Sequence, residues 1–122
     1  MRIRNFTVFI VLLSASCYHI SNEEIKVMLS SEDKRKIIKA SIYISELRDT
    51  TLVSYMLDDG MDPRISHDFR YYGMSIYQIK MGAMKKLTGI NPPYIYNSEP
   101  DSVIFKFYFN LAQQKGWIKT KD

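Results

Sequence analysis

The sequence predicts an all-α fold, and three observations support this prediction. Apolar residues recur at spacings of three and four in several segments, as they do along one face of a helix. Residues that favour helix starts precede these segments, and glycines follow them. The composition, with 46% hydrophobic and 25% charged residues, is typical of a globular chain, and 122 residues are enough for one domain. We therefore expect a single helical domain.

Residues 1–16 have the three parts of a secretory signal peptide. Arg2 and Arg4 form the basic start, an apolar run follows at 6–13, and small residues occupy 14–16. The apolar run is far shorter than the roughly 20 residues that a membrane-spanning helix needs. We predict a secretory signal rather than a permanent membrane span.

Cys17 is the single cysteine and follows the small residues directly. The stretch "LLSASC" resembles the lipobox of bacterial lipoproteins, although its Leu13 stands four positions before the cysteine instead of three. This resemblance implies lipidation of Cys17 and a periplasmic, membrane-anchored domain of residues 17–122. Two alternatives stay open, namely a bystander cysteine beside an ordinary cleavage site and an uncleaved signal. With no second cysteine, the domain has no internal disulfide and depends on packing.

Residues 23–29 and 30–47 are expected to form the first two helices. Ser21 with a glutamate three residues later has the spacing of a capping box, in which both side chains bind free amide groups. The next segment has two capping candidates, Ser30 and Ser31, and acidic residues in its first turn. Its apolar residues form one broad face at helical spacing: Ile37, Ile38, Ala40, Ile42, Ile44 and Leu47.

A third helix is expected with Thr50 or Thr51 as its cap, an apolar stripe of Leu52, Val53, Met56 and Leu57, and its end before Gly60. We predict that Gly60 takes the left-handed conformation, which costs other residues on the order of 1 kcal/mol. The pair Asp62-Pro63 disfavours helix, so the chain turns there. Residues 64–73 have no helical period and are expected to form an exposed excursion.

Two more helices are expected in the last third of the chain. Residues 74–87 have helical spacing, and a linker rich in helix breakers follows at 88–100. The segment 103–109 alternates as a strand would, but it continues into residues that favour helix and ends on Gly116. We predict helix there, with strand as the alternative, and expect Trp117 to fold back over the last turn.

The stretch "LVSYMLDDGMDPRI", residues 52–65, resembles the second helix and following loop of an ankyrin repeat. The family's buried positions and turn would be held by Val53, Met56, Leu57, Gly60 and Met61-Asp62-Pro63. Further along, Gly73 and Ile76 fit the family's Gly-Thr-Pro-Leu-His-Leu-Ala pattern. The resemblance covers residues 34–90 and implies a short array of helical hairpins closed by atypical end helices. The alternative is an irregular helical bundle.

The sequence contains no recognisable catalytic or metal-binding pattern. The histidines, His19 and His67, have no neighbouring ligands at metal spacing, and the pair His67-Asp68 supplies too few donors for zinc. The aspartates at 58, 59 and 62 lack the spacing of a calcium loop. There is no glycine-rich phosphate loop and no nucleophile elbow. We predict no catalytic residue, no cofactor and no enzymatic activity.

Nucleic acid is not expected as a partner. Cleavage before the cysteine would remove two arginines and no acid, which lowers the net charge from +4 to +2. The remaining basic clusters, at 34–36 and at Lys85-Lys86, are more simply explained as solvated helix faces.

Aromatic residues in the predicted loops indicate a protein partner instead. Such rings, together with arginine, carry much of the binding energy in protein interfaces. We predict that the excursion binds a partner through Arg64, Phe69, Arg70, Tyr71 and Tyr72, and the linker adds Tyr94 and Tyr96. The alternative for each ring is packing over the end of a short helix.

These observations lead to one main hypothesis and two alternatives. The main hypothesis is an exported, lipid-anchored, non-catalytic protein-binding module, with an immunity protein against a secreted toxin as its specific form. One alternative is a structural accessory lipoprotein of an envelope assembly. The other is a small envelope enzyme or carrier, which a cleft containing His67, Asp68 and the three nearby aspartates would favour.

Overall fold

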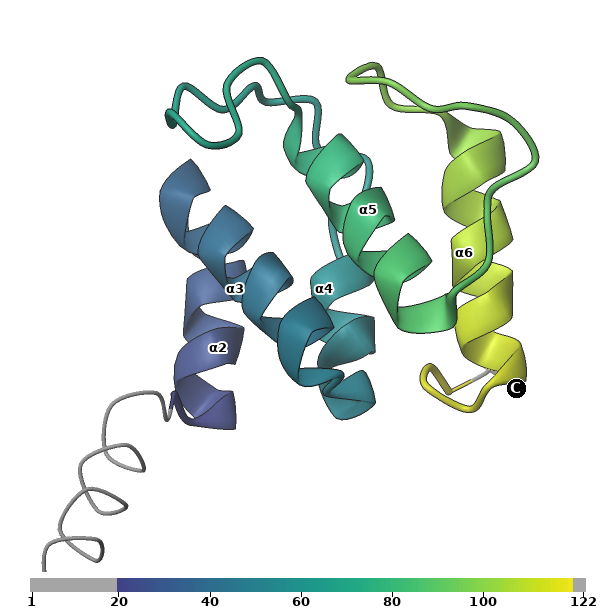
Figure 1. The fold of residues 1–122 in the computed structure, drawn as a ribbon. Coiled ribbons are helices and arrows are strands. Elements are labelled where there is room, and N and C mark those ends of the chain that lie inside the picture. Colours follow the sequence, from purple (N-terminus) through teal and green to yellow (C-terminus); the bar gives the residue numbers. More distant parts are fainter. Residues whose placement is uncertain (1–19, 120–122) are drawn as a thin grey trace, which may run out of the picture.

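The computed structural model describes residues 20–119 and confirms the all-α prediction (Figure 1). The described residues form five α-helices and one short 3-10 helix: α2 (Asn22–Leu29), α3 (Lys34–Leu47), η1 (Thr50–Leu52), α4 (Val53–Leu57), α5 (Ile76–Thr88) and α6 (Ser102–Gln114). This part of the chain contains no strand, only an isolated bridge between Ile65 and Ser75. The segment 103–109 is therefore helix. The predicted signal peptide and Cys17 lie outside the described residues.

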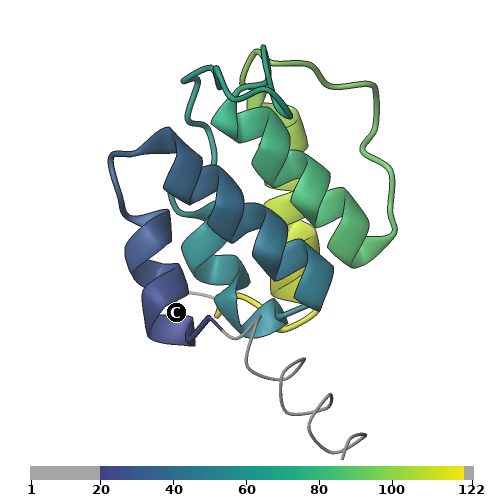
Figure 2. The same ribbon diagram turned by 60° about the vertical axis from the view of Figure 1, so that its left-hand side comes forward.

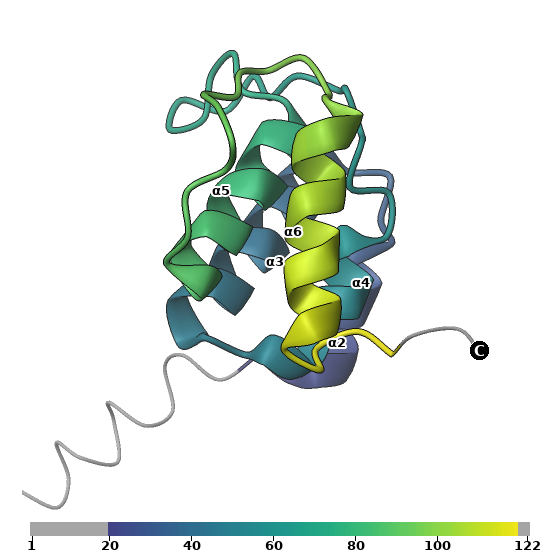
Figure 3. The same cartoon turned by 90° about the vertical axis from the view of Figure 1, so that its right-hand side faces the viewer.

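Helix α3 lies between α2 and α5, and α6 packs against another side of α5 (Figures 2 and 3). The short α4 contacts α2 and lies behind α3 and α5 in the view of Figure 1. All five helices contribute to one core, which includes Ile25, Ile44, Met56, Tyr77, Met81, Ile104 and Tyr108. A smaller cluster of four isoleucines joins the first half of α3 to the first half of α5. This packing fixes the two loops that follow α4 and α5.

The starts of the first helices show which capping predictions hold. Ser21 caps α2 as predicted, because its hydroxyl accepts a hydrogen bond from the Glu24 amide at 3.2 Å. The prediction of Ser30 or Ser31 as the cap of α3 is wrong. Asp33 caps that helix by accepting from the Arg35 amide at 3.0 Å, while the Ser30 hydroxyl bonds back to α2.

The next helical turn is also capped by an aspartate rather than a threonine. Asp49 accepts hydrogen bonds from both the amide and the hydroxyl of Thr51. The prediction of Thr50 or Thr51 as the cap is therefore wrong. In both corrected cases an aspartate stands one residue before the helix, where its carboxylate reaches free amide groups.

Gly60 does not end α4 in the left-handed conformation, so this prediction is wrong as well. The helix ends at Leu57, and the residue with the left-handed backbone is Asp59, at φ 56°. Gly60 is needed for another reason: a Cβ there would collide with the ring of Phe105 and lie 2.9 Å from the Leu57 carbonyl oxygen. Contact with α6, and not backbone twist, requires glycine here.

The end of α6 follows the prediction. Gly116 has a left-handed backbone at φ 77°, and the Trp117 amide donates to the Ala112 carbonyl at 2.8 Å. The Gly116 amide donates to Gln113, which completes the hydrogen-bond pattern of a Schellman cap. Trp117 folds back and packs against the main core.

The buried face of α3 is narrower than the sequence predicts. Leu47 is 58% exposed and Ile42 is only partly buried, so neither belongs to the core. Ser41 and Ser45 are buried instead, and their hydroxyls donate to carbonyls of their own helix. Two satisfied serines therefore face the neighbouring helices, and Ile42 faces a surface groove.

Candidate functional site

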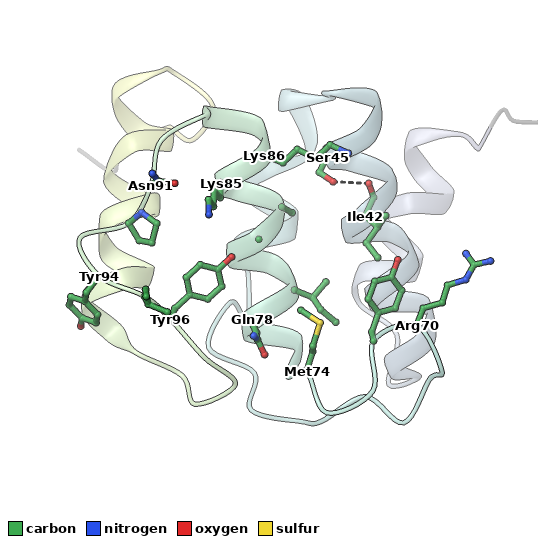
Figure 4. Close-up of a pocket in the computed structure, with 16 residues that line it drawn as sticks. Ile42, Ser45, Arg70, Met74, Gln78, Lys85, Lys86, Asn91, Tyr94 and Tyr96 are labelled. Atoms are coloured by element: carbon green, nitrogen blue, oxygen red, sulfur yellow. Dashed lines mark hydrogen bonds between the residues drawn. The ribbon is translucent and has the colours of Figure 1, made fainter.

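A groove of about 830 Å³ lies between the two long loops, above α3 and α5 (Figure 4). Its floor is the outer face of α5, from Gln78 to Ala83. One wall consists of Tyr71 of the excursion, the adjoining Met74, and Ile42 of α3. The other wall is formed by the linker residues 94–96. The groove thus joins residues that stand more than fifty positions apart in the sequence.

Cations border this groove and acidic residues do not. Arg70, Lys85 and Lys86 line it, and none of the described Asp or Glu side chains does. Both lysines lie in the last turn of α5, where positive charge suits the helix dipole. The surface therefore combines an apolar, tyrosine-walled interior with a positive border.

Two tyrosine hydroxyls fix the linker that forms one wall. The buried Tyr108 donates to the Ile90 carbonyl at 2.9 Å, and burial raises the pKa of Tyr108 to about 12. Tyr94 donates to the Asp101 carboxylate at 2.6 Å. This bond raises the pKa of Tyr94 and lowers that of Asp101, which also caps α6. The linker is thus tied at Ile90, near its start, to α6, and at Tyr94, in its middle, to the residue that caps α6.

The excursion is held by its own backbone. The Ser66 amide donates to Met74 at 2.8 Å, and the Gly73 amide donates back to Ser66 at 3.1 Å. Gly73 has a φ of 81°, which a residue with a side chain would adopt only with strain. Asp68 accepts from the Arg70 amide at 3.0 Å and closes a further turn. The loop therefore presents its side chains from a defined backbone.

The five predicted partner-binding residues fall into three groups. Arg70 and Tyr71 line the groove. Phe69 and Tyr72 project from the excursion, with 98% and 75% of their surface exposed. Arg64 has a different environment, because its guanidinium is bound within the fold.

Arg64 forms the closest ion pair of the described residues, at 2.8 Å from the Asp62 carboxylate, and also donates to the Glu32 carbonyl. Burial by itself would raise the pKa of Asp62, but the hydrogen bonds from the Arg64 side chain and amide outweigh it and lower the pKa. Lys34 donates to the Ile65 carbonyl nearby. This cluster ties the start of the excursion to α3.

A second cavity, of about 270 Å³, contains the three aspartates that the sequence singled out. Asp58, Asp59 and Asp62 line it together with Lys80, which is buried and donates to the Asp58 carbonyl at 3.0 Å. Burial lowers the pKa of Lys80. His67 and Asp68 are not among its lining residues. The cavity therefore contains only the three aspartates of the five residues whose meeting in one cleft would favour an enzyme or carrier.

Sequence reasoning missed several groove residues. The helical period places Ile42 on the buried face of its helix, the pattern around Gly82 predicts only helix, and Lys85 and Lys86 fit an ordinary solvated helix face. A signal did exist for one of them, because an isolated glycine in the middle of a helical pattern often marks a close approach or a functional surface. For the others, only the fold shows that they meet.

The chain matches no known protein family or solved structure, and its described residues contain neither a membrane-spanning helix nor a metal-binding cluster. Between residues 20 and 119, no helix is long and apolar enough to cross a bilayer, and no cluster of three metal-binding side chains occurs. No protein-family model, curated protein or solved structure matches this chain. The ankyrin-like arrangement of the helices stays a prediction.

Proposed function

We propose that this chain is an exported, lipid-anchored protein-binding module without catalytic activity. The observation that carries the proposal is the pair of exposed rings, Phe69 and Tyr72, on a loop whose backbone is fixed by hydrogen bonds. The Phe69 ring is 98% exposed to water, which is unfavourable for an apolar surface of this size. Burial of the ring against a partner would remove this surface from water and stabilise the complex. Because the loop is already ordered, binding costs little conformational entropy.

The groove beside the excursion extends the same surface. Arg70 and Tyr71 connect the two, since both belong to the excursion and both line the groove. Tyrosine and arginine are among the residue types enriched at interface hot spots. An immunity protein that binds a secreted toxin is the specific form we propose. A structural role in an envelope assembly remains the alternative.

A photo-crosslinking experiment tests the proposal. A benzophenone amino acid replaces Phe69 in the full-length protein, expressed in a bacterial host that carries the toxin or envelope assembly under test. We expect a discrete adduct with one protein at this position. Val27 provides the matched control, because it is 68% exposed but lies on α2. Equal adducts from both positions, or none from Phe69, would contradict the proposal.

A further inference from the structure

We infer that the groove binds an acidic segment of the partner protein that carries an aromatic or large aliphatic side chain. This inference rests on the proposed function and specifies the chemistry of the partner at this surface. Three features of the groove support it: its floor, its walls and its charge.

The floor offers space for a large side chain. Gly82 lies in the middle of α5 and lines the groove, so a larger residue there would place its side chain in this space. An added Cβ would lie 3.4 Å from the Tyr96 hydroxyl oxygen, and no other atom is closer. Ile79 and Ala83 continue the floor as apolar surface. The volume of about 830 Å³ falls in the range of sites that hold ligands of several residues or of drug size.

The walls favour a narrow occupant over a flat one. Tyr71 of the excursion and Tyr96 of the linker both line the groove, whose walls these two loops form. Figure 4 shows Tyr96 on the linker side of the α5 floor. Each ring offers an apolar face for packing and a hydroxyl at its edge. A peptide can place one side chain between these walls while its backbone runs along them. A membrane surface has no such projecting element.

The charge selects for acidic neighbours. Arg70 lies at the outer edge of the excursion side, with its guanidinium pointing away from the α5 floor (Figure 4). Lys85 and Lys86 lie at the other end of the floor, Lys85 near Asn91 and Lys86 near Ser45 (Figure 4). None of the three takes part in an ion pair among the described residues. Since no described acid lines the groove, a partner segment with Asp or Glu on both sides of its apolar residue would complement it.

The test begins with selection of short random peptides on the full-length protein. We expect the enriched peptides to contain Asp or Glu around Phe, Trp or Leu. The most enriched peptide, labelled with fluorescein, then serves as the probe for affinity measurements on variants. Enrichment of basic or neutral peptides would overturn the inference.

Two variants test the floor and the charge separately. Gly82→Leu fills the groove and is expected to weaken probe binding at least about tenfold, whereas Asn110→Leu, at an exposed position of α6 outside the groove, should change it less than about twofold. The double variant Lys85→Gln/Lys86→Gln is expected to weaken binding about tenfold at low salt and much less at high salt. Its control is Lys36→Gln/Lys106→Gln, which removes the same charge from exposed sites outside the groove.

The remaining outcomes separate this inference from the proposed function. Thermal melts establish that each variant folds. If Gly82→Leu leaves the affinity for the probe unchanged while the crosslinked adduct at position 69 still forms, the groove inference is wrong and the proposed binding function stands. If no peptide is enriched but phosphatidylglycerol vesicles bind, and this binding depends on Lys85 and Lys86, the groove recognises a lipid surface and the inference is overturned.

Discussion

Single residues determine how the ends of the short helices meet, and Gly60 is the clearest case. Its missing side chain leaves room for the Phe105 ring of α6. We expect Gly60→Ala to lower the free energy of unfolding by roughly 1–3 kcal/mol, because the added methyl group overpacks the contact. Thermal or denaturant unfolding measures this.

A matched glycine serves as the control for that variant. Gly82→Ala adds the same methyl group in a helix interior, where the nearest outside atom is 3.4 Å away. This substitution should stabilise the protein by about 0.5–1 kcal/mol, since alanine favours helix more than glycine. Equal effects of the two substitutions would show that the contact with Phe105 does not govern the Gly60 position.

Two buried tyrosines provide a second prediction. Within the described chain, the Tyr77 hydroxyl is buried and makes no hydrogen bond of good geometry, with only the Asp101 backbone near it, whereas the Tyr108 hydroxyl donates to the Ile90 carbonyl. Tyr77→Phe should therefore raise the free energy of unfolding by about 1 kcal/mol, because it removes an unsatisfied polar group. Tyr108→Phe should lower it by about 1 kcal/mol, because a hydrogen bond is lost. A larger loss for Tyr77→Phe than for Tyr108→Phe would contradict the assignment.

At the level of elements, the pair Asp62 and Arg64 joins the turn after α4 to the loop before α3. The contribution of this ion pair to the free energy of unfolding depends on pH. Because the pKa of Asp62 is lowered in the folded protein, the unfolded chain takes up the proton first as the pH falls. The stabilisation is therefore complete above an unfolded pKa of about 3.9 and is lost as the pH falls through the lower folded value.

Substitution of Asp62 tests this dependence of stability on pH. Asp62→Asn should lower the free energy of unfolding at pH 7 by about 1–3 kcal/mol, as expected for hydrogen bonds to a charged group. The difference from the wild type should shrink in melts below about pH 4. Asp59→Asn is the control, because Asp59 is exposed and asparagine accepts its left-handed backbone equally well. A difference that is constant down to pH 2.5 would disprove the linkage.

For the whole molecule, the main prediction concerns Cys17. We expect the full-length protein, expressed in a bacterial host, to mature to a chain that starts at Cys17 and carries acyl groups. Intact mass and membrane fractionation measure this, beside a Cys17→Ala control that should lose both the acyl mass and the membrane fraction. An unprocessed chain in the cytoplasm would show that residues 1–16 are not a signal peptide.

The sequence by itself determined the helical class and the places where local chemistry acts. Ser21 caps α2 and Gly116 ends α6 as predicted, because each acts on backbone groups only a few residues away. The exposure of the excursion also followed from its lack of a helical period. Such features depend on neighbours in the chain, so a pattern of residues reveals them.

Only the tertiary structure decided the features that depend on distant residues. The role of Gly60 is set by Phe105, and the place of Ile42 is set by loops that begin more than twenty residues later. The groove likewise needs α3, α5 and both loops to be in position before Gly82, Lys85 and Lys86 become parts of one surface. Periodicity identifies which side of a helix is apolar, but the packing of the other helices determines which part of that side stays open.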